Sequence, residues 1–178
     1  MRKLWIAVFS ALVGCSVNAD KKVSLENFEF KTGDDTELFF KNVRQSYYDL
    51  EENKAANFNL FRFKDRIQSD TLPILYLAIV INFLQDEAYL FLEPNDSLAT
   101  QDPLVIKWQD PENKTNGFHE LGSPNREGML RFADKLYQGI KANHQFSLPN
   151  DLPILATKTE REAFRITMAD YYRLTRLE

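Results

Sequence analysis

Apolar residues cluster in short runs through the first two thirds of the chain and recur at helical spacing in the last third. The most apolar run outside the N-terminus is residues 72–84, which hold 13 residues rich in aliphatic and β-branched side chains. This run is too short to cross a membrane as a helix, which needs roughly 20 apolar residues. It predicts a central strand buried on both faces. Two shorter runs bounded by turn residues, 88–92 and 104–108, predict further strands.

The region before the central strand has two interpretations. Residues 23–30 alternate with one slip of phase, which predicts a strand with a bulge. Residues 36–50 contain strand-forming Phe-Phe and Tyr-Tyr pairs, but some of their apolar positions also have helical spacing. The residues that share one helical face are Phe39, Val43, Tyr47 and Leu50. A hairpin of 38–49 with 57–66, joined by a loop at 51–54, is the preferred interpretation, and a helix is the alternative.

Two helices are predicted near the C-terminus. Apolar residues recur every three or four positions from 129 to 140, and Ser123 with Pro124 has the pattern of an N-cap and a first helical residue. A second apolar stripe follows Thr159, which is expected to cap its helix. Strands followed by helices indicate an α+β fold, with an antiparallel sheet of about five or six strands and two C-terminal helices on one face. Residues 23–178 are expected to form a single domain.

The N-terminus carries a secretion pattern. Arg2 and Lys3 precede residues 4–14, an uncharged and mostly apolar run of 11 residues. A basic start followed by an apolar run of about 7–15 residues is typical of a secretory signal peptide. Residues 12–15 read Leu-Val-Gly-Cys, and this ending resembles the bacterial lipobox.

The lipobox resemblance implies a lipoprotein. Residues 1–14 would be removed as the signal peptide, and Cys15 would carry lipid on its thiol and acylation on its new amino group. Two or more acyl chains give stable anchoring. By resemblance to sorting in Gram-negative bacteria, Ser16 favours the outer membrane, with the protein facing the periplasm. Residues 15–22 are polar and predict a flexible tether. Cleavage after Ala19 is the alternative, and it would release a soluble periplasmic protein.

The charge balance disfavours two classes of binding partner. The chain has 22 basic and 26 acidic residues, and loss of Arg2 and Lys3 with the signal peptide leaves a net charge of −6. An acidic exported protein does not suit nucleic-acid binding, and it has no attraction for anionic lipid headgroups. We therefore expect the lipid anchor, rather than surface charge, to hold the protein on the membrane. No cofactor is expected.

One group of residues has the composition of a catalytic site. His119, Glu120 and Ser123 are the residue types of a nucleophilic triad. Against this, no G-x-S-x-G surrounds Ser123, which is already expected to cap a helix. A strand would also point His119 and Glu120 to opposite faces. A hydrolase using His119 is therefore the less favoured function.

The sequence predicts no metal site. His119 and His144 are its two histidines, whereas zinc normally takes three or four nitrogen or sulfur ligands. Residues 110–116 hold several oxygen ligands, but Lys114 occupies the fifth position of that loop and no glycine occupies the sixth, as a calcium loop requires. The adjacent Asp86 and Glu87 are expected to be solvated at a turn.

Three basic residues alternate with phenylalanines in the strand predicted at 57–67. On a strand, Arg62, Lys64 and Arg66 would share one face. Such a face is either simply solvated or a docking face for an acidic partner or a lipid phosphate.

These patterns together predict a lipid-anchored envelope protein that acts as a binding or interaction module, with a partner in the envelope and not as an enzyme. An immunity-type lipoprotein that neutralises a periplasmic effector is the alternative within the same class.

Overall fold

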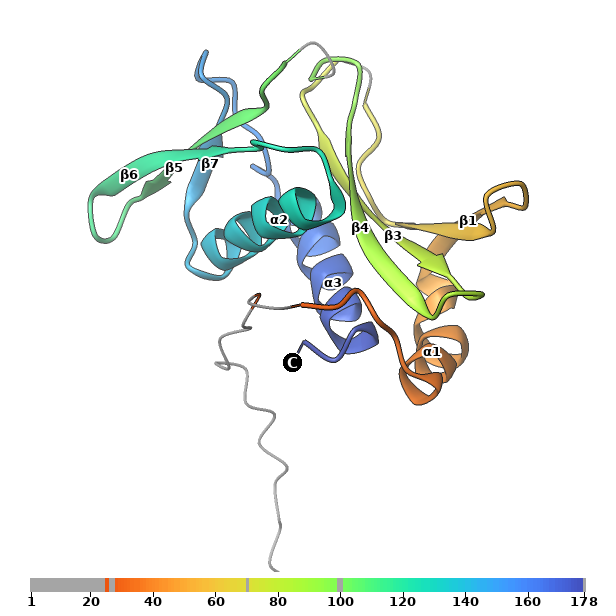
Figure 1. Ribbon diagram of the computed structural model, residues 1–178. Helices are drawn as coiled ribbons and strands as arrows, with labels where there is room; N and C mark the ends of the chain where they lie inside the picture. The colour runs from red at the N-terminus through yellow and green to blue at the C-terminus, as the bar shows by residue number, and fades with distance from the viewer. Residues whose placement is uncertain (1–24, 26–27, 70, 99–100, 178) are drawn as a thin grey trace, which may run out of the picture.

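The computed structural model describes residues 25, 28–69, 71–98 and 101–177. In these residues, strands form two antiparallel sheets and two long helices pack beside them (Figure 1). The α+β class is therefore confirmed. The strands divide into sheets of four and three, where the sequence analysis expected one sheet of five or six.

The four-stranded sheet is an antiparallel meander in the order β1-β2-β3-β4. Its strands are β1 (Tyr48–Asn53), β2 (Phe58–Phe63), β3 (Leu75–Asn82) and β4 (Glu87–Pro94). In β3, Ile79 and Ile81 belong to the main hydrophobic cluster, while Ala78 and Val80 are buried on the opposite face. This confirms the central strand predicted from residues 72–84.

The three-stranded sheet has the order β6-β5-β7. Its strands are β5 (Val105–Asp110), β6 (Thr115–Glu120) and β7 (Gln145–Ser147). The prediction of a strand at 104–108 is confirmed, whereas β6 and β7 were not predicted. Both carry few inward-facing apolar side chains, so they lack the usual hydrophobic signal of a strand. In β6, Gly117 replaces one such side chain because a Cβ there would lie 3.0 Å from the indole of Trp108.

The two C-terminal helices are present as α2 (Arg126–Lys141) and α3 (Lys158–Leu174). Their caps differ from the prediction. The Asn125 side chain, rather than Ser123, accepts a hydrogen bond from the Gly128 N–H, and Thr157, rather than Thr159, caps α3 in a capping box with Glu160. Each segment offers neighbouring residues that are able to cap, so the pattern located the helices but not their first residues.

The helices cover one side of the four-stranded sheet. The α2 helix packs against β4, and α3 packs against both β3 and β4. One hydrophobic cluster includes side chains from both sheets and both helices. The expected packing of the helices on one sheet face is therefore present, with the three-stranded sheet added beside α2.

The segment before β1 is helical, which contradicts the hairpin preferred in the sequence analysis. Residues 34–47 are helical and comprise α1 (Asp34–Phe39), a π-helical turn η1 (Phe40–Arg44) and a 3₁₀ turn η2 (Gln45–Tyr47). Acidic residues in the first turn of α1 favour this helix. The hairpin begins only at the Tyr48–Phe63 pair and includes residues 51–53 in β1, so the hairpin over 38–47 and the loop at 51–53 were wrong.

The strand predicted at 23–30 is also wrong for the residues that the structure describes. Leu25 and residues 28–30 are irregular, and an isolated bridge joins Lys31 to Glu87. Phe28 and Phe30 pack against the main hydrophobic cluster. Their spacing reflects this packing of an irregular segment rather than a strand.

Replacement of Ile79 by alanine tests the position of the core. Ile79 is fully buried, whereas Leu84 at the β3–β4 turn is 75% exposed. We expect Ile79→Ala to lower the free energy of unfolding by about 2–5 kcal/mol because it leaves a cavity. Leu84→Ala should change it by less than about 0.5 kcal/mol. Urea unfolding measures both, and equal effects would contradict the assigned burial of β3.

Candidate docking surface

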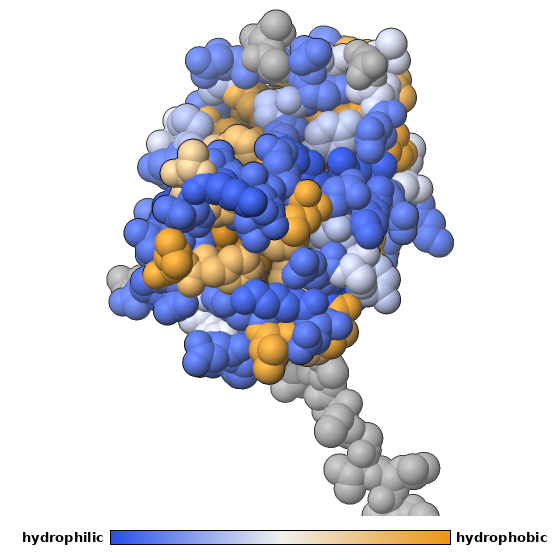
Figure 2. All heavy atoms as spheres, turned by 90° about the vertical axis from the view of Figure 1, so that its right-hand side faces the viewer, coloured by the Kyte–Doolittle hydropathy of each residue, from blue (hydrophilic) through white to orange (hydrophobic). Residues whose placement is uncertain are grey.

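An exposed apolar strip runs along the helical segment before β1. Phe40 of this segment is buried in the core, but Phe39, Val43 and Tyr47 are 36%, 47% and 50% exposed. We call these three residues the apolar strip. Figure 2 views the end of the molecule that carries α1 and β1, and it shows hydrophobic atoms between hydrophilic ones on the lower half of that end. Large side chains exposed together are typical of interaction sites.

A buried polar network fixes this segment to α3. The Arg44 Nε donates to both carboxylate oxygens of Asp170, at 2.8 and 2.9 Å, and the Tyr48 hydroxyl donates to the same carboxylate at 2.7 Å. Asp170 is only 5% exposed. Burial, followed by the negative charge of Asp170, raises the pKa of Tyr48 far above its usual range, so the hydroxyl remains a hydrogen-bond donor.

Two arginines cover part of the apolar strip. The Arg173 guanidinium lies 5.1 Å from the ring centre of Phe39, and that of Arg44 lies 4.6 Å from the ring centre of Tyr47. Both distances fit cation–π contacts. These contacts restrict the motion of the two aromatic rings.

A groove lies along the N-terminal half of α3. It encloses about 240 Å³ and is lined by the end of β2, the following Asp65 and the helix, including Phe63, Ala163 and Ile166. Positions 162, 166, 170 and 173 of α3 are three or four residues apart, so they share one face of the helix. The groove and the apolar strip therefore lie along the same face of α3.

The predicted basic face is largely neutralised within the molecule. Arg62 forms a bidentate pair with Glu93 at 2.6 and 2.7 Å and donates to Glu51 at 2.6 Å. Arg66 donates to Asp49 at 2.6 Å, and the Lys64 ammonium donates to the Ser46 carbonyl at 2.8 Å. Because β2 ends at Phe63, Lys64 and Arg66 lie beyond the strand that was expected to align all three. Their docking role stays a prediction.

The structure places His119 in an aromatic stack. The Trp108 indole lies between two imidazoles, with ring centres 5.9 Å from His119 and 4.9 Å from His144, and both pairs are nearly parallel. His144 also lies 3.7 Å from the Asp110 carboxylate. Partial burial, followed by electrostatic repulsion from Lys135 and His144, lowers the pKa of His119.

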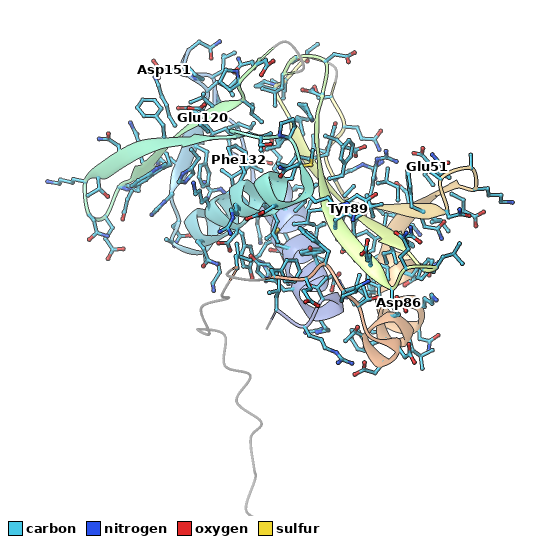
Figure 3. All side chains as sticks on the ribbon, viewed as in Figure 1. Glu51, Asp86, Tyr89, Glu120, Phe132 and Asp151 are labelled. Atoms are coloured by element: carbon cyan, nitrogen blue, oxygen red, sulfur yellow. The ribbon has the colours of Figure 1, made fainter. Side chains whose placement is uncertain are left out.

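The other residues of the candidate triad do not join this stack. Glu120 is exposed and alternates with His119 along β6, so it points to the opposite face; Figure 3 labels it on that strand. Within the described residues, no hydrogen bond links Ser123 to His119. The arrangement provides an imidazole without an activated nucleophile.

The loop between β5 and β6 is organised by hydrogen bonds. The Asp110 carboxylate accepts from the backbone N–H groups of Glu112 and Asn113, at 2.9 and 3.1 Å, and from the Asn113 amide at 2.7 Å. These contacts lower the pKa of Asp110, with the Asn113 side chain contributing most. Within the ranges that the structure describes, no three His, Cys, Asp or Glu side chains gather as a metal site would require.

The paired carboxylates at the β3–β4 turn have separate surroundings. Asp86, labelled in Figure 3, is in the turn itself. Glu87 begins β4 and contacts Lys31 at 3.3 Å and Arg126 at 3.0 Å. Glu87 is therefore part of a local ion-pair network rather than a simply solvated turn residue.

The predicted lipidation site Cys15, the predicted signal peptide at 1–14 and the predicted tether at 15–22 lie outside the described residues. Among the helices that the structure does describe, none has the length and apolar content to cross a membrane. Comparison with models of protein families, with curated protein sequences and with solved structures finds no match to this chain.

The sequence carries a partial signal for the apolar strip, which does not mark it as a surface. The helical spacing of Phe39, Val43 and Tyr47 was visible. Periodicity identifies the residues that share a face, but it does not show whether that face meets the core. Here the neighbouring Phe40 enters the core instead, packing on Phe61 with ring centres 5.1 Å apart.

Removal of the Asp170 carboxylate tests how the strip is held. We expect Asp170→Ala to lower the free energy of unfolding by about 3–5 kcal/mol, because it leaves Arg44 and Tyr48 without a buried acceptor. Glu162→Ala on the same helix breaks only the exposed pair with Arg165 and should cost at most about 1 kcal/mol. Urea unfolding of both variants makes the comparison, and a similar small loss in each would contradict the anchoring role of Asp170.

The pH dependence of stability tests the stack around Trp108. Because the pKa of His119 is lowered in the folded state, the unfolded chain binds more protons as the pH falls through about 6.5. Stability is therefore lost on acidification below that value. His119→Phe keeps an aromatic ring and should lose less stability between about pH 7.5 and 5.5. Urea unfolding followed by tryptophan fluorescence measures this, and an identical loss in both proteins would contradict it.

Proposed function

We propose that this protein is a lipid-anchored protein of the bacterial envelope that faces the periplasm and binds another envelope protein through the apolar strip. The lipobox-like sequence at residues 12–15 supports the anchor. The exposure of Phe39, Val43 and Tyr47 supports the binding role. Of these observations, the exposed strip carries the proposal that the protein is an interaction module.

The charges around the strip favour a protein as the occupant. Near the strip, Arg44 is neutralised by Asp170, Lys41 pairs with Glu37 at 3.7 Å, and Arg176 pairs with Asp35. An apolar centre with a balanced polar rim is the usual composition of a protein–protein interface. A surface that binds anionic lipid would instead need an excess of basic side chains.

The aromatic residues suit this role as well. Phenylalanine and tyrosine are enriched at protein interfaces, and tyrosine and arginine dominate the positions that contribute most to affinity. The apolar strip contains Phe39 and Tyr47 with an arginine over each ring. We infer that these two rings are the anchoring contacts.

Replacement of Cys15 tests the anchor. We expect the natural protein to partition into the detergent phase and to carry lipid on an N-terminal cysteine, because acyl chains give stable membrane attachment. Cys15→Ala should abolish both properties. Mass spectrometry of the mature N-terminus provides the measurement, and an unmodified N-terminus at Asp20 would contradict the lipid anchor while leaving a soluble periplasmic protein.

Site-specific photo-crosslinking in intact cells tests the docking surface. A photoreactive residue at Val43 should give a distinct crosslinked product with an envelope protein. The same residue at Leu152 provides a matched control, because both positions are 47% exposed. A product of the same mass and yield from both positions, or none from Val43, would contradict the docking role. If the partner proves to be a periplasmic effector, the immunity-type alternative is supported.

A further inference from the structure

A polar cleft lies between the three-stranded sheet and the start of α3, on a different part of the fold from the apolar strip. It encloses about 440 Å³, which falls within the usual range of small-ligand sites, about 300–1,000 Å³. Its polar lining side chains are Gln109, Gln145, Ser147, Asp151 and Arg161. Asp151, labelled in Figure 3, is on the loop that follows β7.

Arg161 is held in the wall of this cleft by neutral groups. Its Nε donates to the Leu155 carbonyl at 2.8 Å and its Nη2 to the His144 carbonyl at 2.5 Å. The guanidinium also lies 5.7 Å from the ring centre of Phe146. These contacts use two of the five N–H donors of an arginine, and both acceptors are neutral carbonyls rather than carboxylates.

The surrounding carboxylates are already engaged. No carboxylate of the described residues lies within ion-pairing distance of Arg161. Asp151 pairs with Lys107 at 2.8 Å, and the Glu160 carboxylate accepts from Thr157 in the cap of α3. Burial lowers the pKa of Arg161, and the nearby negative charge of Glu160 opposes this shift. A partly buried guanidinium whose hydrogen-bond acceptors are all neutral can therefore gain a direct ion pair from an anion in the cleft.

The remaining walls of the cleft offer neutral hydrogen-bonding groups. The side chains of Gln109 and Gln145 project from paired positions on β5 and β7, and Ser147 follows two residues along the same face. Their amides and hydroxyl can donate as well as accept. Such groups suit the uncharged polar part of a ligand, while arginine suits an oxyanion because its planar fork matches two oxygens.

We propose that this cleft is a binding site for a small polar ligand that carries an oxyanion, either a carboxylate or a phosphate. Arg161 binds the oxyanion, and Gln109, Gln145 and Ser147 bind the neutral part. This site is independent of the apolar strip, and its existence does not require the lipid anchor.

The test uses the whole protein, purified from cells in mild detergent and followed by NMR. The probes are diglycine, which has a free carboxylate, diglycinamide, which lacks it, and inorganic phosphate. We expect saturable shifts of the signals of Gln109, Gln145 and Ser147 with diglycine or with phosphate, and none with diglycinamide. Saturation by diglycine alone identifies a carboxylate site, and saturation by phosphate alone identifies a phosphate site.

A charge added inside the cleft provides the matched variant. Gln109→Glu leaves the contacts of Arg161 with the two carbonyls intact, and it should weaken binding of the active probe by at least about tenfold through like-charge repulsion. Gln68→Glu adds the same charge at an exposed position that does not line the cleft and should bind like the natural protein. Equal binding by the two variants would overturn the site. Shifts no larger than those caused by sodium chloride at the same ionic strength would show that Arg161 only links the backbone at Leu155 and His144. That result would also overturn the proposed site.

Discussion

The fold depends on the burial of β3 on both faces. Helices cover one face, where Ile79 and Ile81 join the main cluster. Among the described residues, the small cluster on the other face contains no helix residue, yet Ala78 is fully buried and Val80 is 2% exposed. Long side chains from the neighbouring strands must therefore provide the cover.

The ion pairs on that outer face have this structural role. Arg62 lies opposite Ala78 in the strand register and reaches Glu93 on β4 and Glu51 on β1. An arginine stem covers apolar surface while its charged end stays partly solvated. Tyr89 and Phe58 pack against the same small cluster. The side chain that looked most like part of a basic docking face therefore contributes to the cover of the central strand.

The helical segment before β1 is attached differently. Within the described residues, Phe40 is its one buried residue before Tyr48, so apolar packing alone gives it a narrow contact with the core. The Asp170 carboxylate of α3 accepts hydrogen bonds from Arg44 and Tyr48 and so adds a polar attachment. This polar attachment allows Phe39, Val43 and Tyr47 to remain at the surface, so the apolar strip is still exposed in the folded protein.

Elements with strong periodicity could be predicted from sequence, whereas those defined by tertiary contacts could not. The central strand and both long helices have patterns that local rules recognise. Residues 34–47 contain strand-forming side chains, so their local propensity does not predict a helix. Their packing on α3 favours the helical conformation. Strand β7 is only three residues long and exists because β5 offers a partner. The Arg161 cleft combines residues 109, 145, 147 and 161, whose meeting depends on that same pairing and has no local signal.

Helix α3 separates the two proposed surfaces. Asp170 fixes the segment that carries the apolar strip, and Arg161 lines the cleft. These residues are nine positions apart, which corresponds to about 900° of helical rotation, or two and a half turns. They therefore project from opposite sides of α3. If both proposed sites are real, a small ligand at Arg161 and a protein on the apolar strip bind on opposite sides of α3, without steric conflict.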